Sequence, residues 1–186
     1  MPISHAILGF LEYQPMSGYD LKKFFDQSVA HFWSATQSHI YKALEKLEED
    51  ELVTSKFIQQ EGKPNRKEYH ITKAGRAELK KWLATPLPLA PVREAWMIQL
   101  FFAHSLSNEE IAKLLEERKK EILKVSEELD QARATIERNK AGAAPGMERM
   151  SALWQTTLDY GIDYYKSELA WLDKTLKRTP KLPPLK

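Results

Sequence analysis

Cysteine and long apolar runs are absent from this sequence, and glycine is sparse. It has zero cysteines among 186 residues, so it offers no disulfide framework and no thiolate chemistry. No window holds the ~20 consecutive apolar residues of a membrane-spanning helix. The apolar opening AILGFL has neither the basic flank nor the small-residue cleavage site of a signal peptide. These absences favour a reducing compartment and no membrane partner, and we expect the cytoplasm.

Motifs of catalysis and of metal binding are missing as well. The 5 histidines form no HExxH pair, and the 7 glycines are scattered and form no phosphate-binding loop. No serine lies in a GxSxG setting, and the many carboxylates fall on exposed faces of expected helices. We therefore expect neither an enzyme nor a bound metal or cofactor.

Charge is distributed in two small patches of opposite sign. The net charge is only +2, which excludes a polycation. Between Lys56 and Lys67 the basic side chains face a single acid, Glu61, whereas acids surround Lys46 between Glu45 and Glu51. An electrostatic partner must therefore meet a narrow basic patch.

The first 85 residues combine helical spacing with one strand-like stretch. Apolar spacing predicts helices near Ile3, Ser17 and Ser34, and the last two begin with the S-x-x-D or S-x-x-Q pattern of a capping box. The segments LVTSKFIQQ and KEYHIT alternate in polarity around the turn EGKPNR, which predicts a β-hairpin with a basic tip. Thr72 can cap a further helix. This order of elements is typical of a winged helix-turn-helix domain.

The proline-rich stretch TPLPLAPV predicts a domain boundary, giving domains of residues 1–85 and 86–186. Beyond it we expect only helices: residues 92–104, a long helix capped by Ser107, and a last helix over 147–177. The fold class is thus mainly α with a small β-hairpin. Both long helices carry an apolar seam that predicts dimerisation, with an intrachain helical hairpin as the alternative. The residues assigned to the dimer interface are Leu115, Ile122, Val125, Leu129, Ile136, Leu158, Ile162, Tyr165, Leu169 and Leu172.

The third expected helix begins with small and polar residues, and its acidic residues come only at its C-terminal end. With Ile40 at the centre of its buried face, Ser38 and Lys42 point away from the core. Small residues allow close approach to a DNA groove, and recognition helices contact DNA with their N-terminal residues. The alternative is a solvated surface helix, but the basic hairpin that follows favours nucleic acid.

Three segments resemble the winged-helix domain of the PadR family of bacterial transcriptional regulators: AILGFLEYQPMSGYDLKKFF, IYKALEKLEEDELV and YHITKAGRAELKKWL. The long helical tail resembles that of the larger PadR subgroup, which the virulence activator AphA shares. The resemblance implies a homodimer on an inverted-repeat operator in double-stranded DNA, usually as a repressor. Glu51 stands where family members usually have glycine. Carried over by position, the DNA-binding residues are Tyr19, Ser34, Ala35, Thr36, Gln37, Ser38, His39, Tyr41, Lys42, Lys63, Asn65, Arg66 and Lys67.

The family's founding member is released from DNA by phenolic acids, so the resemblance also implies a small aromatic effector. Aromatic residues are the usual lining of such sites, although core packing is the commoner role of tryptophan at helical spacing. The candidates are Trp33, Trp96, Trp154 and Tyr160. Two alternatives stay open: a winged-helix protein-interaction adaptor, and an AphA-like activator without a small-molecule ligand.

Overall fold

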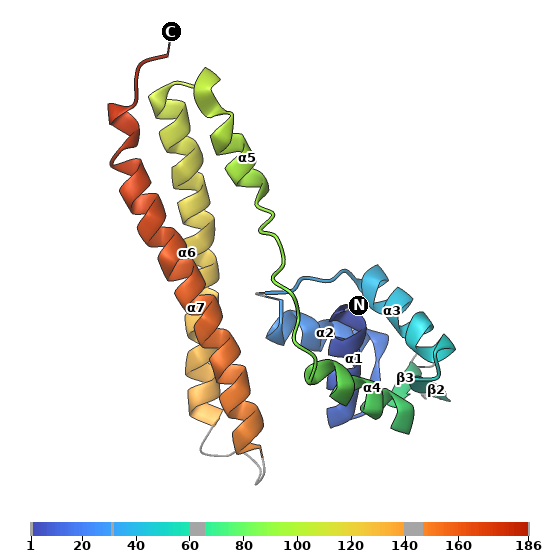
Figure 1. Cartoon of the computed structure of the whole chain (residues 1–186). Helices are drawn as coiled ribbons and strands as arrows, with labels where there is room; N and C mark the ends of the chain where they lie inside the picture. The colour runs from blue at the N-terminus through green and yellow to red at the C-terminus, as the bar shows by residue number, and fades with distance from the viewer. Residues whose placement is uncertain (1, 31, 60–65, 140–146, 186) are drawn as a thin grey trace. The chain divides into compact units, whose positions relative to one another are not determined.

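A computed structural model describes residues 2–30, 32–59, 66–139 and 147–185 (Figure 1). The chain divides into two compact units, Met1–Ala90 and Pro91–Lys186. The division falls in the proline-rich segment, a few residues after the expected boundary at Thr85. Within the described ranges, no helix has the length and apolar character needed to cross a membrane.

The described part of the N-terminal unit contains four helices and a small sheet. Its elements are α1 (Pro2–Tyr13), β1 (Met16–Ser17), α2 (Gly18–Ser28), α3 (Gln37–Glu49), β2 (Val53–Ile58), β3 (Arg66–Ile71) and α4 (Lys73–Leu83). The strands lie in the order β1-β3-β2 and are all antiparallel. The β2–β3 pair is the expected hairpin, whereas the two-residue strand β1 was not expected. Because Met16 pairs with Tyr69, the sheet joins the start of α2 to the hairpin.

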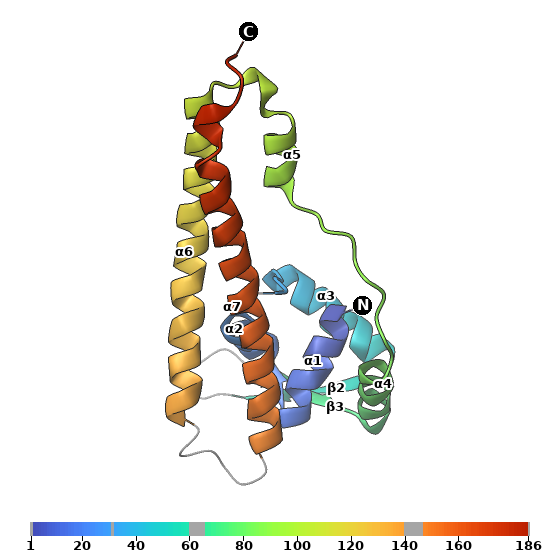
Figure 2. The ribbon, with the colours of Figure 1, turned by 60° about the vertical axis from the view of Figure 1, so that its left-hand side comes forward.

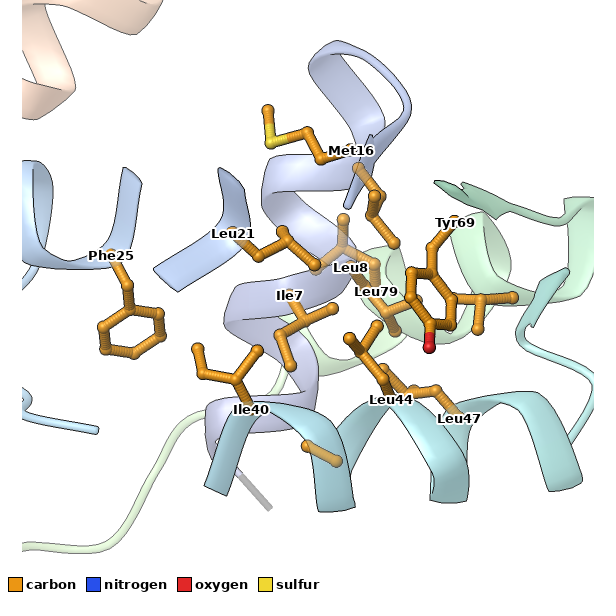
Figure 3. Packing of buried hydrophobic residues seen from close by; sticks show 13 residues of the cluster. Ile7, Leu8, Met16, Leu21, Phe25, Ile40, Leu44, Leu47, Tyr69 and Leu79 are labelled. Atoms are coloured by element: carbon orange, nitrogen blue, oxygen red, sulfur yellow. The ribbon is translucent and has the colours of Figure 1, made fainter. Parts of the chain in front are cut away.

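The core of this unit is built from one face of each helix. Figure 3 shows Ile7 and Leu8 of α1 meeting Leu21 of α2, with Ile40 and Leu44 of α3 on the other side. All five side chains have no exposed surface. The predicted stripe of α3 therefore faces the core, and the opposite face of α3 is left outward.

In the N-terminal unit, two of the three helix caps that the sequence predicts are found. Ser17 accepts from the backbone N–H of Asp20, whose carboxylate accepts from Ser17, which confirms the predicted capping box. Thr72 caps α4 as expected. The prediction that Ser34 starts α3 is wrong, because Thr36 is the cap and accepts from the N–H of His39 at 3.3 Å.

This later start changes the predicted front of α3. Ala35 precedes the helix and packs, partly buried, against the core, so the prediction that it points away from the core is wrong. Its assignment as a DNA contact stays a prediction. Ser34 and Thr36 are exposed but lie in the segment before the first turn. The helical face available to a partner therefore begins at Gln37.

Glu51 ends α3 in a left-handed backbone conformation. Its φ is 58°, the only positive φ of a non-glycine residue in the part of the chain that the structure describes. The N–H of Glu51 donates to the carbonyl of Glu48, and that of Leu52 donates to Leu47. These two bonds form a Schellman cap, which normally has glycine at this position.

We expect Glu51→Gly to raise the free energy of unfolding by about 1 kcal/mol, because an L-residue in this conformation carries roughly that much strain. Urea unfolding of both proteins measures the change. Asp50→Gly is the matched control, since Asp50 has φ −80° and carries no such strain. A less stable Glu51→Gly protein would contradict this account of the cap.

The C-terminal unit is entirely helical in its described part. Its elements are α5 (Ala95–Phe101), the short turn η1 (Ala103–Ser105), α6 (Asn108–Asn139), α7 (Glu148–Leu176) and the turn η3 (Thr179–Lys181). The expected helix over 92–104 is shorter than predicted. Ser107 and Glu110 form the predicted capping box of α6, each accepting from the other's N–H. Figures 1 and 2 both show α6 and α7 side by side as a helical hairpin.

The apolar seams of α6 and α7 are buried against each other within one chain. Leu115 and Ile122 of α6 share a cluster with Leu172 of α7, and Leu129 shares a second cluster with Leu158 and Ile162. The remaining seam residues, Val125, Ile136, Tyr165 and Leu169, pack against these clusters.

Six of the residues assigned to the dimer interface are therefore buried within the chain, as the alternative of an intrachain hairpin predicts: Leu115, Ile122, Leu129, Leu158, Ile162 and Leu172. For Val125, Ile136, Tyr165 and Leu169, which are only partly buried, the assignment stays a prediction. The physical reason is proximity, because two helices joined by residues 140–147 meet far more often than two separate chains do. Arg118, which interrupts the seam, donates from Nε to Glu168 Oε1 at 2.9 Å across the hairpin.

Candidate nucleic-acid interface

The outward face of α3 carries short polar side chains and one cation. Gln37, Ser38, His39 and Lys42 are all exposed, as the sequence predicts. The first turn contains no acid, so the partial positive charge of the helix N-terminus is not compensated there. Among the described residues Lys42 has no ion-pair partner, whereas Lys46 in the next turn pairs with Asp50 at 2.9 Å. This front can accept an anion such as a DNA phosphate.

Tyr19 and Tyr41 flank this face from α2 and α3. Tyr19 lies in the first turn of α2 and is 67% exposed. Tyr41 packs over the start of α2, since a Cβ on Gly18 would lie only 2.7 Å from its ring. The glycine at position 18 thus lets the two helices approach, and Tyr41 holds α3 against α2 while its edge stays accessible.

Lys67 on strand β3 is paired with α3. Its Nζ lies 2.8 Å from Glu48 Oε2, and the ammonium also lies 5.0 Å from the centre of the Tyr69 ring. The other carboxylate oxygen of Glu48 accepts from Ser55 on β2. The hydrogen bond that Lys67 donates to Glu48 lowers the pKa of Glu48 and raises the pKa of Lys67, so both stay charged near neutral pH.

Arg66 is paired with the start of α2. Its guanidinium lies 3.2 Å from Asp20 Oδ2 and 3.1 Å from Glu68 Oε2. Asp20 is the carboxylate of the α2 capping box, so Arg66 binds a group that already orders the helix start. The predicted wing contacts Lys63 and Asn65 lie outside the described residues.

Two features of this surface were not predicted from the sequence, namely the pairing of Glu48 and a role for Lys56 as a free cation. The pairing of Glu48 with both wing strands was not expected, although the acids near the end of α3 were noted. Lys56 lies on β2, where its partner in the sheet register is Glu68 of β3. It is exposed and has no ion-pair partner in the described ranges. The alternation of polar and apolar residues in the hairpin shows which cations lack an acidic partner only when the pairing register of the two strands is known.

The predicted effector residues fall on both units. Trp33 belongs to the N-terminal unit, while Trp96, Trp154 and Tyr160 belong to the C-terminal unit. Trp96 packs edge-on against Trp171, with ring centres 5.7 Å apart. Trp154 precedes Trp171 by 17 residues, which is roughly 25 Å along a helix. Within one C-terminal unit, Trp96 and Trp154 therefore line different places.

A shallow pocket of about 300 Å³ lies beside Trp96. Its lining residues are Glu94, Trp96, Met97, Tyr164, Ser167, Glu168 and Trp171. Burial, more than the neighbouring Glu94 and Glu168, raises the pKa of Tyr164. The pocket lining includes the carboxylates of Glu94 and Glu168, and Arg118 lies within 3.7 Å of both. Two acids against one base give the pocket a net negative charge, which does not favour an anionic ligand. No cluster suited to a metal ion occurs among the described residues.

Two family descriptions match the two units of the chain. Residues 7–81 match the transcriptional regulator PadR-like family, and residues 92–179 match the virulence activator alpha C-terminal family. The two matches together cover most of both units and leave only the proline-rich segment and the termini outside.

Among curated relatives, a probable transcriptional regulator of Mycobacterium tuberculosis is 44% identical over 94 residues, a match that spans about half of each chain. The negative transcriptional regulator PadR of Bacillus subtilis is 29% identical over 176 residues, covering 94% of this chain and 95% of that protein.

Similarity to solved structures also extends over nearly the whole chain. The crystal structure of Bacillus subtilis PadR with operator DNA has a TM-score of 0.79 at 27% identity, covering 96% of this chain and 99% of that one. The same regulator in complex with p-coumaric acid has a TM-score of 0.74 at 24% identity, covering 96% and 95%.

Proposed function

The chain belongs to the PadR-like family of transcriptional regulators, and from this premise we propose that it is a homodimeric repressor that binds an inverted-repeat operator. In this proposal α3 enters the major groove and the β2–β3 wing lies along the neighbouring backbone. The observation that supports it is the outward face at the start of α3. Its first turn has no acid, and Lys42 has no ion-pair partner among the residues that the structure describes.

The geometry of α3 suits groove binding. Ser38 and His39 are short enough to let the helix approach base edges, and both can donate or accept hydrogen bonds. Lys42, one turn further, can reach a phosphate while the acids of the last turn stay away from the DNA. The structure of PadR with operator DNA supports the same orientation for this chain, because the two chains align along almost their whole length.

Because six of the seam residues are buried within the chain, we propose that the dimer contact also uses other surfaces. The helix α5 and the residue after it expose a run of large apolar side chains, with Phe101 80%, Ile98 63% and Phe102 61% accessible. Contiguous exposed apolar surface of this kind commonly marks a protein interface. We include this surface in the proposed dimer contact.

An electrophoretic mobility-shift titration tests the proposal. The purified protein is titrated against the DNA upstream of its own gene at two salt concentrations. A repressor of this kind binds that DNA in preference to a scrambled fragment, and its affinity falls steeply with salt because phosphate contacts release counterions. Binding without sequence preference or without salt dependence would favour the adaptor alternative.

Lys42→Met gives the sharpest test of the assigned recognition helix. We expect the salt-dependence slope of a dimer to fall by about 2, one phosphate contact per subunit, with a weakening that is similar across operator sequences. Lys46→Met is the matched control, since Lys46 pairs with Asp50 on the same helix, and its slope should not change. Equal effects of the two variants would argue against this placement of α3.

We further propose that a small aromatic effector relieves binding. The PadR complex with p-coumaric acid makes p-coumarate the first probe. An effector of this kind acts through its different affinities for the DNA-bound and free conformations. Addition of p-coumarate to the titration should weaken operator binding, and Trp154→Ala should reduce that response without changing binding in its absence. Tight operator binding that p-coumarate leaves unchanged would instead support a regulator without this ligand.

A further inference from the structure

The two basic residues at the start of β3 each bind a different helix of the helix-turn-helix. Consecutive residues of a strand point to opposite faces. Lys67 accordingly reaches Glu48 of α3, while Arg66 reaches Asp20 of α2. On the basis of the proposed DNA-binding function, we propose that Arg66 and Lys67 are positioning residues that fix the wing on the two helices, and that they are not phosphate contacts.

Glu48 is the centre of the contact with α3. Its Oε2 accepts from Lys67 of β3 and its Oε1 accepts from Ser55 of β2, so one carboxylate holds both strands of the wing. Ser55 pairs with Tyr69 in the sheet register, two residues beyond Lys67 on the same strand. The contacts therefore fix the hairpin at two points and set its angle to the recognition helix.

The local charge also argues against a phosphate partner for these cations. The two cations stand among three carboxylates, those of Asp20, Glu48 and Glu68. A phosphate that approached Lys67 would displace Glu48 and bring like charges close together. In contrast, Lys56 on the neighbouring strand is exposed and has no ion-pair partner in the described ranges, so it is the described wing cation that is free to meet a phosphate.

The expected effect acts through geometry more than through stability. Glu48 and Lys67 are each about 35% exposed, and an ion pair at such a site adds little to the free energy of unfolding. A wing that rotates on its helices, however, moves its tip relative to the DNA backbone. Loss of the pair should therefore weaken operator binding while the fold is retained.

A charge exchange tests this directly. We expect Glu48→Lys and Lys67→Glu each to weaken operator binding about tenfold, and the double variant, which restores the pair in reverse, to bind within about threefold of the parent protein. If Lys67 contacts phosphate instead, Glu48→Lys binds more tightly and the double variant stays as weak as Lys67→Glu. That result would overturn the proposal.

The salt dependence of binding provides a second, independent readout. Lys67→Met should leave the slope unchanged, because no counterion release depends on Lys67. Lys56→Met, the matched control on the same hairpin, should lower the slope of a dimer by about 2. A fall of the same size for Lys67→Met would assign it to a phosphate and contradict the positioning role.

Hydrogen exchange without DNA separates this inference from the proposed function. Glu48→Gln and Lys67→Met should each speed the exchange of amides in β2 and β3, and their combination should do no more than either alone. Unchanged exchange would overturn the proposal even if the protein binds its operator. Failure of the parent protein to bind any operator would count against the proposed function, while the exchange experiment would still test the contact.

Discussion

Replacement of Gly75 by alanine is expected to lower the free energy of unfolding of the N-terminal unit by about 3 kcal/mol, the upper part of the range for overpacked sites. A Cβ at this position would lie 2.2 Å from the carbonyl oxygen of Leu52 and 2.9 Å from the side chain of Ile71. The first of these atoms is backbone, so no change of rotamer can relieve the overlap. Leu52 is further fixed because its carbonyl accepts from both the N–H and the hydroxyl of Thr72.

Chemical unfolding followed by circular dichroism measures this loss, and Gly9→Ala is its matched control. Gly9 lies within α1, and a Cβ there meets nothing within 4 Å. Alanine is about 1 kcal/mol more favourable than glycine inside a helix, so Gly9→Ala should stabilise the protein. The same substitution thus has opposite signs at the two sites. A Gly75→Ala protein as stable as the parent would show that α4 does not pack on the start of the wing as described.

The consequence for DNA binding follows from the position of Gly75. The N–H of Gly75 donates to the hydroxyl of Thr72 at 3.0 Å, and this hydroxyl donates to the carbonyl of Glu51. Gly75 therefore lies at the junction of β3 with α4, next to the junction of α3 with β2. Displacement of this junction would move both the β2–β3 hairpin and the C-terminal end of α3, the proposed recognition helix. Operator affinity of any folded Gly75→Ala protein should therefore fall as well.

The sequence predicted the elements of the N-terminal unit well where the signal is local. Ser17 with Asp20 and Thr72 with Gly75 are caps whose partners are three residues away, and both were found as expected. Ser34 failed although it has the same local pattern. Two hydroxyl residues, Ser34 and Thr36, compete for the start of α3, and packing of Ala35 on the core decides for the later one.

Contacts between distant segments were beyond local patterns. The pairing of β1 with β3 depends on Met16 meeting Tyr69, which no spacing rule reveals. The same holds for Lys67 and Glu48, whose positions in sequence suggested a free basic wing and a separate acidic helix end. Charge counting along the chain located these residues correctly but could not tell that they neutralise one another.

The seams of the long helices show a different kind of ambiguity. A heptad pattern states that a helix must bury one stripe, but it does not state whether the partner is in the same chain. Arg118 is the seam residue that can identify the partner helix, because a cation inside an apolar seam needs an acid opposite. Glu168 of the same chain provides it, and its position could be found only from the pairing of α6 with α7.

Leu172→Ala is expected to destabilise the C-terminal unit by about 3 kcal/mol, within the range for leucine side chains removed from a well-packed core. Leu172 has 0% exposure and shares a buried cluster with Leu115 and Ile122 of the facing helix. Leu123→Ala is the control, because Leu123 lies on α6 but is 43% exposed, and its loss should change stability by less than about 1 kcal/mol. Urea unfolding at widely separated protein concentrations measures both effects.

The concentration dependence decides between a seam within the chain and one between chains. If the seam is intrachain, the difference in stability between Leu172→Ala and the parent protein is the same at every protein concentration. A seam between two chains would instead make that difference shrink on dilution, since Leu172 would already be exposed in the dissociated monomer of the parent protein. The intrachain result would also place the dimer contact elsewhere, and it would leave the exposed apolar side chains of α5 and Phe102 as the surface to mutate next.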